Sequence, residues 1–103
     1  MTEFYKKIYL LSGKIPKRDR FGIYAKTESI ALDILSLVLS AALERKTNKF
    51  ILLDKARVNI EVLKRLIRMM NELRIIERKK YIFLQTDLQE ISKMTNGWIK
   101  FLK

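Results

Sequence analysis

The residue types that most enzymes use for chemistry are missing or scattered in this sequence. It contains no histidine and no cysteine, which excludes imidazole and thiolate metal sites, disulfides, and Ser-His or Cys-His nucleophile pairs. No glycine-rich phosphate loop is present. The carboxylates that are candidates for paired acid chemistry form neither a Glu-x-x-His motif nor an obvious di-acid motif; they are Asp33, Glu44, Asp54, Glu61, Asp87 and Glu90. We therefore expect no catalytic residue, no metal site and no cofactor.

Basic side chains are the chemistry that the sequence does supply. Lys and Arg number 22 against 11 Asp and Glu, which gives the 103-residue chain a formal charge of +11. A net positive charge of this size attracts polyanions, because binding releases their counterions. A solubility role is the plainer alternative, but a balanced surface serves solubility as well. We favour RNA or DNA, bound through phosphates.

Sequence-specific recognition is not expected. The chain has no helix-turn-helix spacing, no zinc finger and no aromatic pair in a strand that would stack bases. The tyrosines lie at helical spacing, which is more typical of core or rim positions; they are Tyr5, Tyr9, Tyr24 and Tyr81. Binding should therefore be driven by the phosphate backbone, sensitive to salt and weakly specific.

The elements that must position these cations are predicted to be helices. Only three glycines and one proline interrupt the chain, and no alternating β-branched run appears. The predicted helices cover residues 2–13, 16–44, 48–76 and 78–95 and are followed by a C-terminal Gly-Trp-Ile-Lys tail. Short connections between them predict an all-α fold, an antiparallel up-down-up-down four-helix bundle in a single domain of residues 1–103.

Local signals mark the predicted helix ends. Thr2 is a natural N-cap for the first helix, and Pro16 suits the first turn of the second because its missing N–H has no partner there. Asn96 and Gly97 are expected to end the fourth helix in a left-handed conformation. Trp98 would then fold back over the end of the bundle as a hydrophobic lock, a role we favour over direct stacking on a base.

Up-down-up-down threading brings the first and last loops to one end of the bundle. Eight cations gather there with Asp19 and Glu77: Lys14, Lys17, Arg18, Arg20, Arg74, Arg78, Lys79 and Lys80. Lys14 and Arg74 lie near helix C-termini, where positive charge is favourable. The other six lie in or beside first turns, where it is unfavourable by roughly some tenths of a kcal/mol each. Because folding alone would not select them, we predict that these six bind phosphates; an ordinary solvated surface is the alternative.

A second candidate surface is the exposed face of the third helix. Its cations are Arg57, Lys64, Arg65 and Arg68. Glu61 interrupts this stripe and can form ordinary ion pairs within the helix, so a structural role is as well supported as a binding role. A further basic group, at the opposite end of the bundle, consists of Arg45, Lys46, Lys49, Lys93, Lys100 and Lys103.

Helix lengths and apolar patterns predict self-association. The second and third helices, each about 28 residues, outreach a first helix of about 12, so one short helix cannot cover both. The second helix is apolar on most sides and the third on two. We therefore expect an oligomer interface at Val58, Val62, Met69 and Trp98. The alternative is a thicker internal core around Phe21, Tyr24 and Phe50.

Three stretches of the chain together resemble the Avd proteins, the accessory variability determinants of diversity-generating retroelements. They are KIPKRDRFGI (14–23), ARVNIEVLKRLIRMMNELRII (56–76) and GWIK (97–100), and the resemblance covers nearly the whole chain. It implies a homopentameric barrel of basic four-helix bundles without catalysis. Such a protein would associate with the reverse transcriptase and bind template RNA or cDNA in mutagenic retrohoming. The first helix is about two turns shorter here than in that family.

The same resemblance leaves a second function open. Avd proteins belong to a wider four-helix bundle superfamily that includes the proteins encoded in rRNA intervening sequences. The alternative is therefore a structural or protein-interaction module of that type, whose positive charge meets an acidic protein partner.

We expect a cytoplasmic protein with no membrane partner. The first residues lack the order of a signal peptide. The longest apolar run, Ile30 to Leu43, is too short to span a bilayer and carries Asp33.

Overall fold

The computed structural model describes residues 1–102, and its regular structure there is entirely helical. The elements are α1 (Thr2–Leu10), the 3-10 helix η1 (Ser12–Lys14), α2 (Lys17–Arg20), α3 (Ile23–Leu43), α4 (Lys46–Glu72) and α5 (Arg78–Leu102). No strand occurs within the described range. This confirms the predicted all-α class, with α1, α3, α4 and α5 as the main helices.

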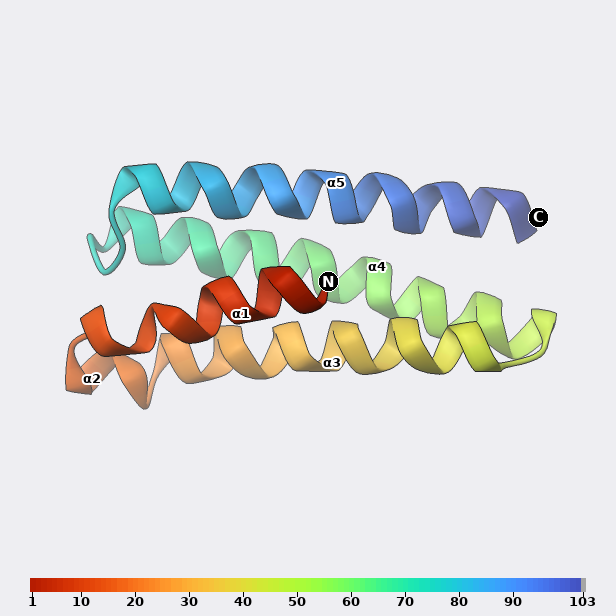
Figure 1. Cartoon of the computed structure of the whole chain (residues 1–103), viewed down its shortest axis with the longest axis horizontal. Coiled ribbons are helices and arrows are strands. Elements are labelled where there is room, and N and C mark those ends of the chain that lie inside the picture. Colours follow the sequence, from red (N-terminus) through yellow and green to blue (C-terminus); the bar gives the residue numbers. More distant parts are fainter. Residues whose placement is uncertain (103) are drawn as a thin grey trace.

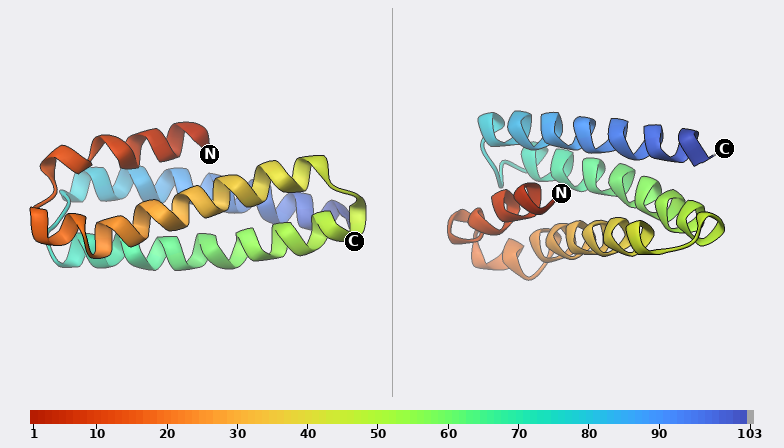
Figure 2. Two further views of the ribbon diagram at one scale, coloured as in Figure 1. Left: turned by 90° about the horizontal axis from the view of Figure 1, so that it is seen from below. Right: turned by 45° about the vertical axis from the view of Figure 1, so that its right-hand side comes forward.

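Three long helices form the body of the molecule. Figure 1 shows α3, α4 and α5 lying along the longest axis of a molecule that measures 42 × 22 × 19 Å. The short helix α1 packs against α3 and α5 at one end only, and the N-terminus lies near the middle of the long axis (Figures 1 and 2). The α4–α5 connection lies at the same end as α2, whereas the α3–α4 connection and the C-terminus lie at the other (Figure 2).

The core follows the 3.6-residue periodicity of the long helices. The apolar spacing of α4 in the sequence predicts a buried stripe of Leu52, Ala56, Ile60, Leu63, Ile67, Met70 and Leu73. The side chains that the structure buries are Leu53, Ala56, Ile60, Leu63, Ile67 and Met70, so the prediction is wrong only at its two ends. A main cluster joins α1, α3, α4 and α5, and a smaller cluster of Ala41, Leu53 and Ile99 lies near the C-terminus of α5. The apolar periodicity of the sequence thus places the core correctly.

The prediction of one unbroken second helix over residues 16–44 is wrong. The chain forms the single-turn helix α2, leaves helical geometry at Gly22 (φ −110°, ψ −114°) and begins α3 at Ile23. Glycine inside a helix is unfavourable, and it readily adopts other backbone conformations. Beyond this break Tyr24 is buried while Phe21 is 80% exposed, so Phe21 is not part of the thicker core considered above.

The first helix also differs in its details. It ends at Leu10, before the predicted limit of residue 13, and η1 carries the chain onward. Its N-cap residue is Met1 instead of Thr2, with no side-chain cap hydrogen bond. The nine residues of α1 cover less of the bundle than the predicted twelve.

The third helix spans Lys46–Glu72 instead of the predicted 48–76. Arg74 follows it with a positive φ of 59°, and the N–H groups of Arg74 and Ile75 donate to the carbonyls of Asn71 and Met70 at 3.0 and 2.8 Å. These two bonds form a Schellman motif with arginine at the left-handed position that usually holds glycine. The motif releases the chain from the helix and leads into the buried Ile76.

The predicted end of the fourth helix at residue 95 is wrong as well. Helix α5 continues to Leu102, Gly97 lies inside it, and none of the glycines described here has a positive φ. Trp98 is therefore a helical residue and does not fold back as a separate tail. Thr95 and Ile99 extend the buried stripe at the four-residue spacing of Ile91, and this burial offsets the helix penalty of glycine, roughly 1 kcal/mol.

Candidate nucleic-acid interface

All eight cations that the sequence analysis assigned to one end of the bundle do lie there, and we call them the basic pole. Lys14 ends η1, and Arg74 lies in the α4–α5 connection. The remaining six lie in α2 and in the first turn of α5; they are Lys17, Arg18, Arg20, Arg78, Lys79 and Lys80. Figure 1 shows α2 and the α4–α5 connection at the same end of the molecule. Connections remote in sequence therefore supply one charged surface.

A cavity of about 440 Å³ opens at the basic pole, between η1 and the α4–α5 connection. Four cations line it: Lys14, Arg74, Arg78 and Lys80. Glu77 is the single acidic residue in its lining, and within residues 1–102 no ion pair joins any of the four to a carboxylate. Several uncompensated positive charges thus surround one concave site, a favourable arrangement for an anion.

The cations of α2 and the cations that line the cavity differ in their surroundings. Lys17, Arg18 and Arg20 are exposed on α2 and lie outside the lining of this cavity. The N-terminus of α2 adds little to the positive charge of the pole, since α2 has four residues and a correspondingly small dipole. Helix α5 has 25 residues and no acidic residue in its first turn. Its positive end therefore adds to the charge of Arg78 and Lys80.

The cations of α4 are mostly paired. Arg57 lies 2.8 Å from Asp54, Lys64 lies 3.2 Å from Glu61, and Arg68 lies 3.0 Å from Glu72. Each pair lies within one helix at three- or four-residue spacing. Of the predicted α4 surface, only Arg65 has no ion pair within the described chain. The structure thus supplies the ordinary helical pairing that the sequence analysis gave as the alternative role.

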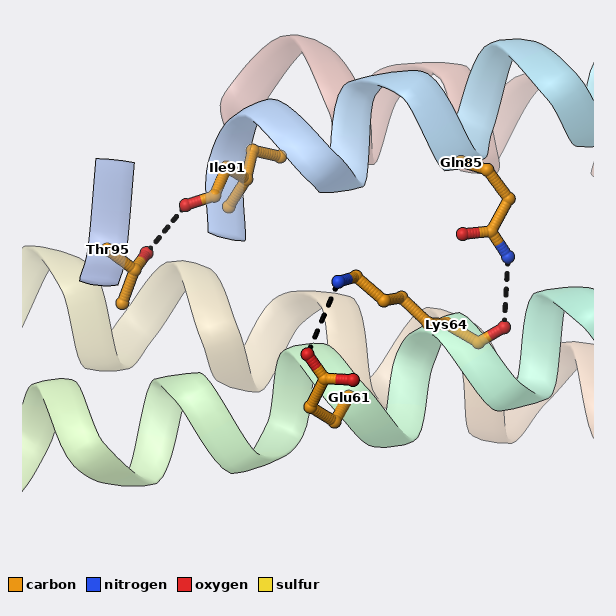
Figure 3. A network of polar contacts seen from close by, with 5 residues as sticks. All are labelled: Glu61, Lys64, Gln85, Ile91 and Thr95. Carbon is orange, nitrogen blue, oxygen red and sulfur yellow. Dashed lines mark hydrogen bonds and ion pairs between the residues drawn. The ribbon is translucent and has the colours of Figure 1, made fainter. Parts of the chain in front are cut away.

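Lys64 lies where α4 and α5 are tied together. Its backbone carbonyl accepts a hydrogen bond of 3.1 Å from Nε2 of Gln85, and its ammonium reaches back to Glu61, as Figure 3 shows. The Lys64 side chain is only partly exposed. Farther along α5, the Thr95 hydroxyl donates to the carbonyl of Ile91 and is satisfied within its own helix (Figure 3). The contacts of Lys64 therefore serve the packing of α4 against α5.

The model of the bAvd-like family matches residues 1–102. The chain belongs to the bAvd-like family. This confirms the resemblance to Avd proteins that the three sequence stretches indicated. No curated protein matches the sequence.

In the part of this bAvd-like protein that the structure describes, neither a metal-binding cluster nor a membrane-spanning helix is found. Residues 1–102 bring together no group of three acidic side chains that could hold a metal ion. Within the same range, every helix is too short or too polar to cross a membrane.

The opposite end of the bAvd-like bundle carries the further basic group that the sequence predicts there. There the ammonium of Lys49 lies 5.5 Å from the centre of the Trp98 ring, a cation–π geometry between α4 and α5. Trp98 packs against the small cluster of Ala41, Leu53 and Ile99 and is partly buried. Lys103, which the sequence analysis also placed here, lies outside the described residues.

Exposed apolar side chains follow two helices of this bAvd-like protein. Val58, Val62 and Met69, the predicted interface residues of α4, are 47%, 39% and 47% exposed. No interface residue was predicted on α3, yet α3 carries a shallow depression of about 360 Å³ without a charged side chain, lined by Leu32, Leu35, Ser36, Leu39, Ser40 and Leu43. The spacing of these leucines was the signal that could have identified them.

Proposed function

We propose that this protein is a non-enzymatic accessory protein of a diversity-generating retroelement. In this proposal it binds the reverse transcriptase and nucleic acid, either template RNA or cDNA, and supports mutagenic retrohoming. Membership of the bAvd-like family supports the accessory role. The observation that carries the nucleic-acid part is the cavity at the basic pole, where one concave site is surrounded by four cations from η1, the α4–α5 connection and α5 that form no ion pair within residues 1–102.

Electrostatics makes phosphate the favoured ligand of that site. The four lining cations repel one another in the absence of an anion, and a bound phosphate removes that repulsion while releasing counterions. The exposed cations of α2 extend the positive surface beyond the cavity. Binding by this means depends on the backbone of the nucleic acid and decreases steeply with salt.

Self-association is the second part of the proposal. The antiparallel bundle would assemble into a homo-oligomeric barrel, a pentamer as in the Avd family, through the apolar surfaces of α3 and α4. Helix α1 leaves half the length of the long helices without a fourth neighbour (Figure 2), and exposed leucines line that half of α3. An assembly would repeat the basic pole around its axis and multiply its field.

A charge-reversal variant tests the nucleic-acid part. The variant carries Arg18→Glu, Arg20→Glu, Lys79→Glu and Lys80→Glu, all exposed. Its matched control carries four reversals at the opposite end, namely Arg45→Glu, Lys46→Glu, Lys93→Glu and Lys100→Glu. Affinity for single-stranded RNA, duplex DNA and heparin is measured by fluorescence anisotropy at several salt concentrations, and helicity by circular dichroism.

We expect the pole variant to lose affinity and to show a shallower salt dependence, because fewer counterions are released, while its helicity is kept. The control should lose less. Equal losses in the two variants would contradict a localised site. If the unmodified protein binds no nucleic acid at moderate salt, the alternative of a bundle with an acidic protein partner replaces this proposal.

A further inference from the structure

We propose that the groove between α1 and α5 binds single-stranded nucleic acid, with one base stacked on Phe83 and the adjacent phosphates held by Lys14 and Lys80. This inference rests on the proposed function and specifies where and in which form the nucleic acid binds. It adds a base-stacking contact to a surface for which the sequence predicted phosphate contacts alone.

The groove consists of two adjoining cavities. The cavity at the basic pole lies next to a second one of about 320 Å³ between α1 and α5, and the two share Leu11, Lys14 and Lys80 in their linings. The second cavity adds Lys7, Leu10, Phe83 and Leu84. The four cations of the pole therefore lie next to an apolar floor beside α5.

Phe83 is an exposed aromatic residue in the groove and is not part of the hydrophobic core. It is 55% exposed, and Leu10 across the groove is 75% exposed, although Leu11 and Leu84 next to them are buried. An aromatic ring with a free face beside lysines is the arrangement by which proteins bind single strands, since every base has a face that stacks. The sequence indicated the tyrosines and Trp98 as candidates for base stacking, and not Phe83.

The charges of the groove favour an anionic occupant. No acidic residue lines the second cavity, and Lys14 and Lys80 have no ion pair within residues 1–102. Lys7, by contrast, lies 2.6 Å from Asp87 and joins α1 to α5 across the groove. Lys7 therefore holds the two walls together, while Lys14 and Lys80 are left to contact phosphates.

The dimensions of the apolar floor favour a base over a protein segment. Only Leu10, Leu11, Phe83 and Leu84 supply apolar surface to the second cavity. An amphipathic partner helix would need apolar anchors over at least two turns, and this floor has room for far fewer. A duplex keeps its bases stacked inside, so only a single strand can present one to Phe83.

Phe83→Ala tests the inference, with Phe101→Ala as its matched control. Both rings are exposed and belong to α5, but Phe101, 85% exposed, lies at the opposite end of that helix. Anisotropy is measured with a labelled 20-nucleotide oligouridine and with a duplex of equal length. Phe83→Trp, which keeps a stacking ring, and Phe83→Leu, which keeps only apolar surface, complete the set. Circular dichroism checks that each variant is folded.

We expect Phe83→Ala and Phe83→Leu to weaken binding of the single strand by about 5-fold to about 100-fold and to leave duplex binding unchanged. Phe83→Trp and Phe101→Ala should bind as the unmodified protein does. If Phe83→Ala changes neither affinity while reversal of Lys14 and Lys80 lowers both, nucleic-acid binding stands and the stacking site is wrong. Loss of binding to the reverse transcriptase, without loss for the single strand, would assign the groove to protein docking and overturn the inference.

Discussion

The hydroxyl of Tyr24 on α3 donates a hydrogen bond of 2.7 Å to the backbone carbonyl of Ile8 on α1. Both residues are buried, and the same hydroxyl lies 3.2 Å from Oε2 of Glu28. Helix α1 is only nine residues long and packs on one end of the bundle, so this bond and the burial of Phe4 and Ile8 fix it to α3. Tyr24 thereby positions one wall of the groove between α1 and α5.

Tyr24→Phe is expected to lower the free energy of unfolding by about 1 kcal/mol, because a buried carbonyl loses one of its donors. For a domain of this size the midpoint of thermal unfolding should fall by about 4–8 °C. Tyr81→Phe is the control, since within residues 1–102 the Tyr81 hydroxyl forms no hydrogen bond. Thermal circular dichroism measures both. An unchanged midpoint for Tyr24→Phe would contradict the structural role of the bond.

Stability should also fall at high pH through the same residue. Burial, and secondarily the nearby carboxylate of Glu28, raise the pKa of Tyr24 above its ordinary value of 10.0. Above about pH 10 the unfolded chain therefore loses this proton while the folded chain retains it, and unfolding becomes more favourable as pH rises. The contribution is fully present below about pH 10. Urea unfolding measures the free energy of unfolding of the unmodified protein and of Tyr24→Phe. We expect the difference between the two values to shrink as pH rises above about 10. A difference that stays constant with pH would refute this linkage.

Gly97→Ala is expected to stabilise the protein by roughly 0.5–1 kcal/mol. Gly97 lies inside α5 with an ordinary negative φ, and a methyl group added there would meet no atom within 4 Å. Alanine restricts the unfolded chain and favours the helix without a clash. The measurement is urea unfolding. A loss of stability would instead support the left-handed helix end that the sequence predicted at this position.

Arg74→Gly should raise stability and lower affinity for nucleic acid. Its φ of 59° costs an L-residue roughly 1–2 kcal/mol, which glycine avoids. The same change removes one of the cations that line the cavity of the basic pole, so the salt slope of RNA binding should decrease by about one. Arg74→Lys keeps both the charge and the strain and serves as the control. Unchanged RNA affinity in Arg74→Gly would exclude Arg74 from the phosphate site.

Leu39→Glu should reduce the molar mass that light scattering reports in solution. Leu39 is 59% exposed on the uncharged face of α3, so a carboxylate there leaves the monomer folded but is costly at an apolar interface. Leu73→Glu, at a leucine 63% exposed near the basic pole, is the matched control. Val62→Glu makes the same test on α4. A mass unaffected by Leu39→Glu would remove α3 from the proposed assembly.

The sequence could predict the all-α class, the apolar stripes and the family because these depend on periodicity and composition. The stripe of α4 from Ala56 to Met70 is one example, since spacing alone selects the buried face. The two glycines show the limit of such reasoning. Gly22 interrupts a predicted helix, whereas Gly97 lies inside one that was predicted to end. The helix penalty of glycine is only roughly 1 kcal/mol, so burial of the neighbouring side chains determines whether the helix continues through it.

The same division applies to the candidate site. Sequence alone determined that the protein is basic, that it lacks the residues for common enzyme chemistry and that cations cluster near two of its connections. Only the tertiary structure decided that Lys14, Arg74, Arg78 and Lys80 share one cavity, and that Phe83 lies exposed beside it. These residues are brought together by the packing of α1 against α5, a contact between the two ends of the chain that no local pattern in either helix encodes.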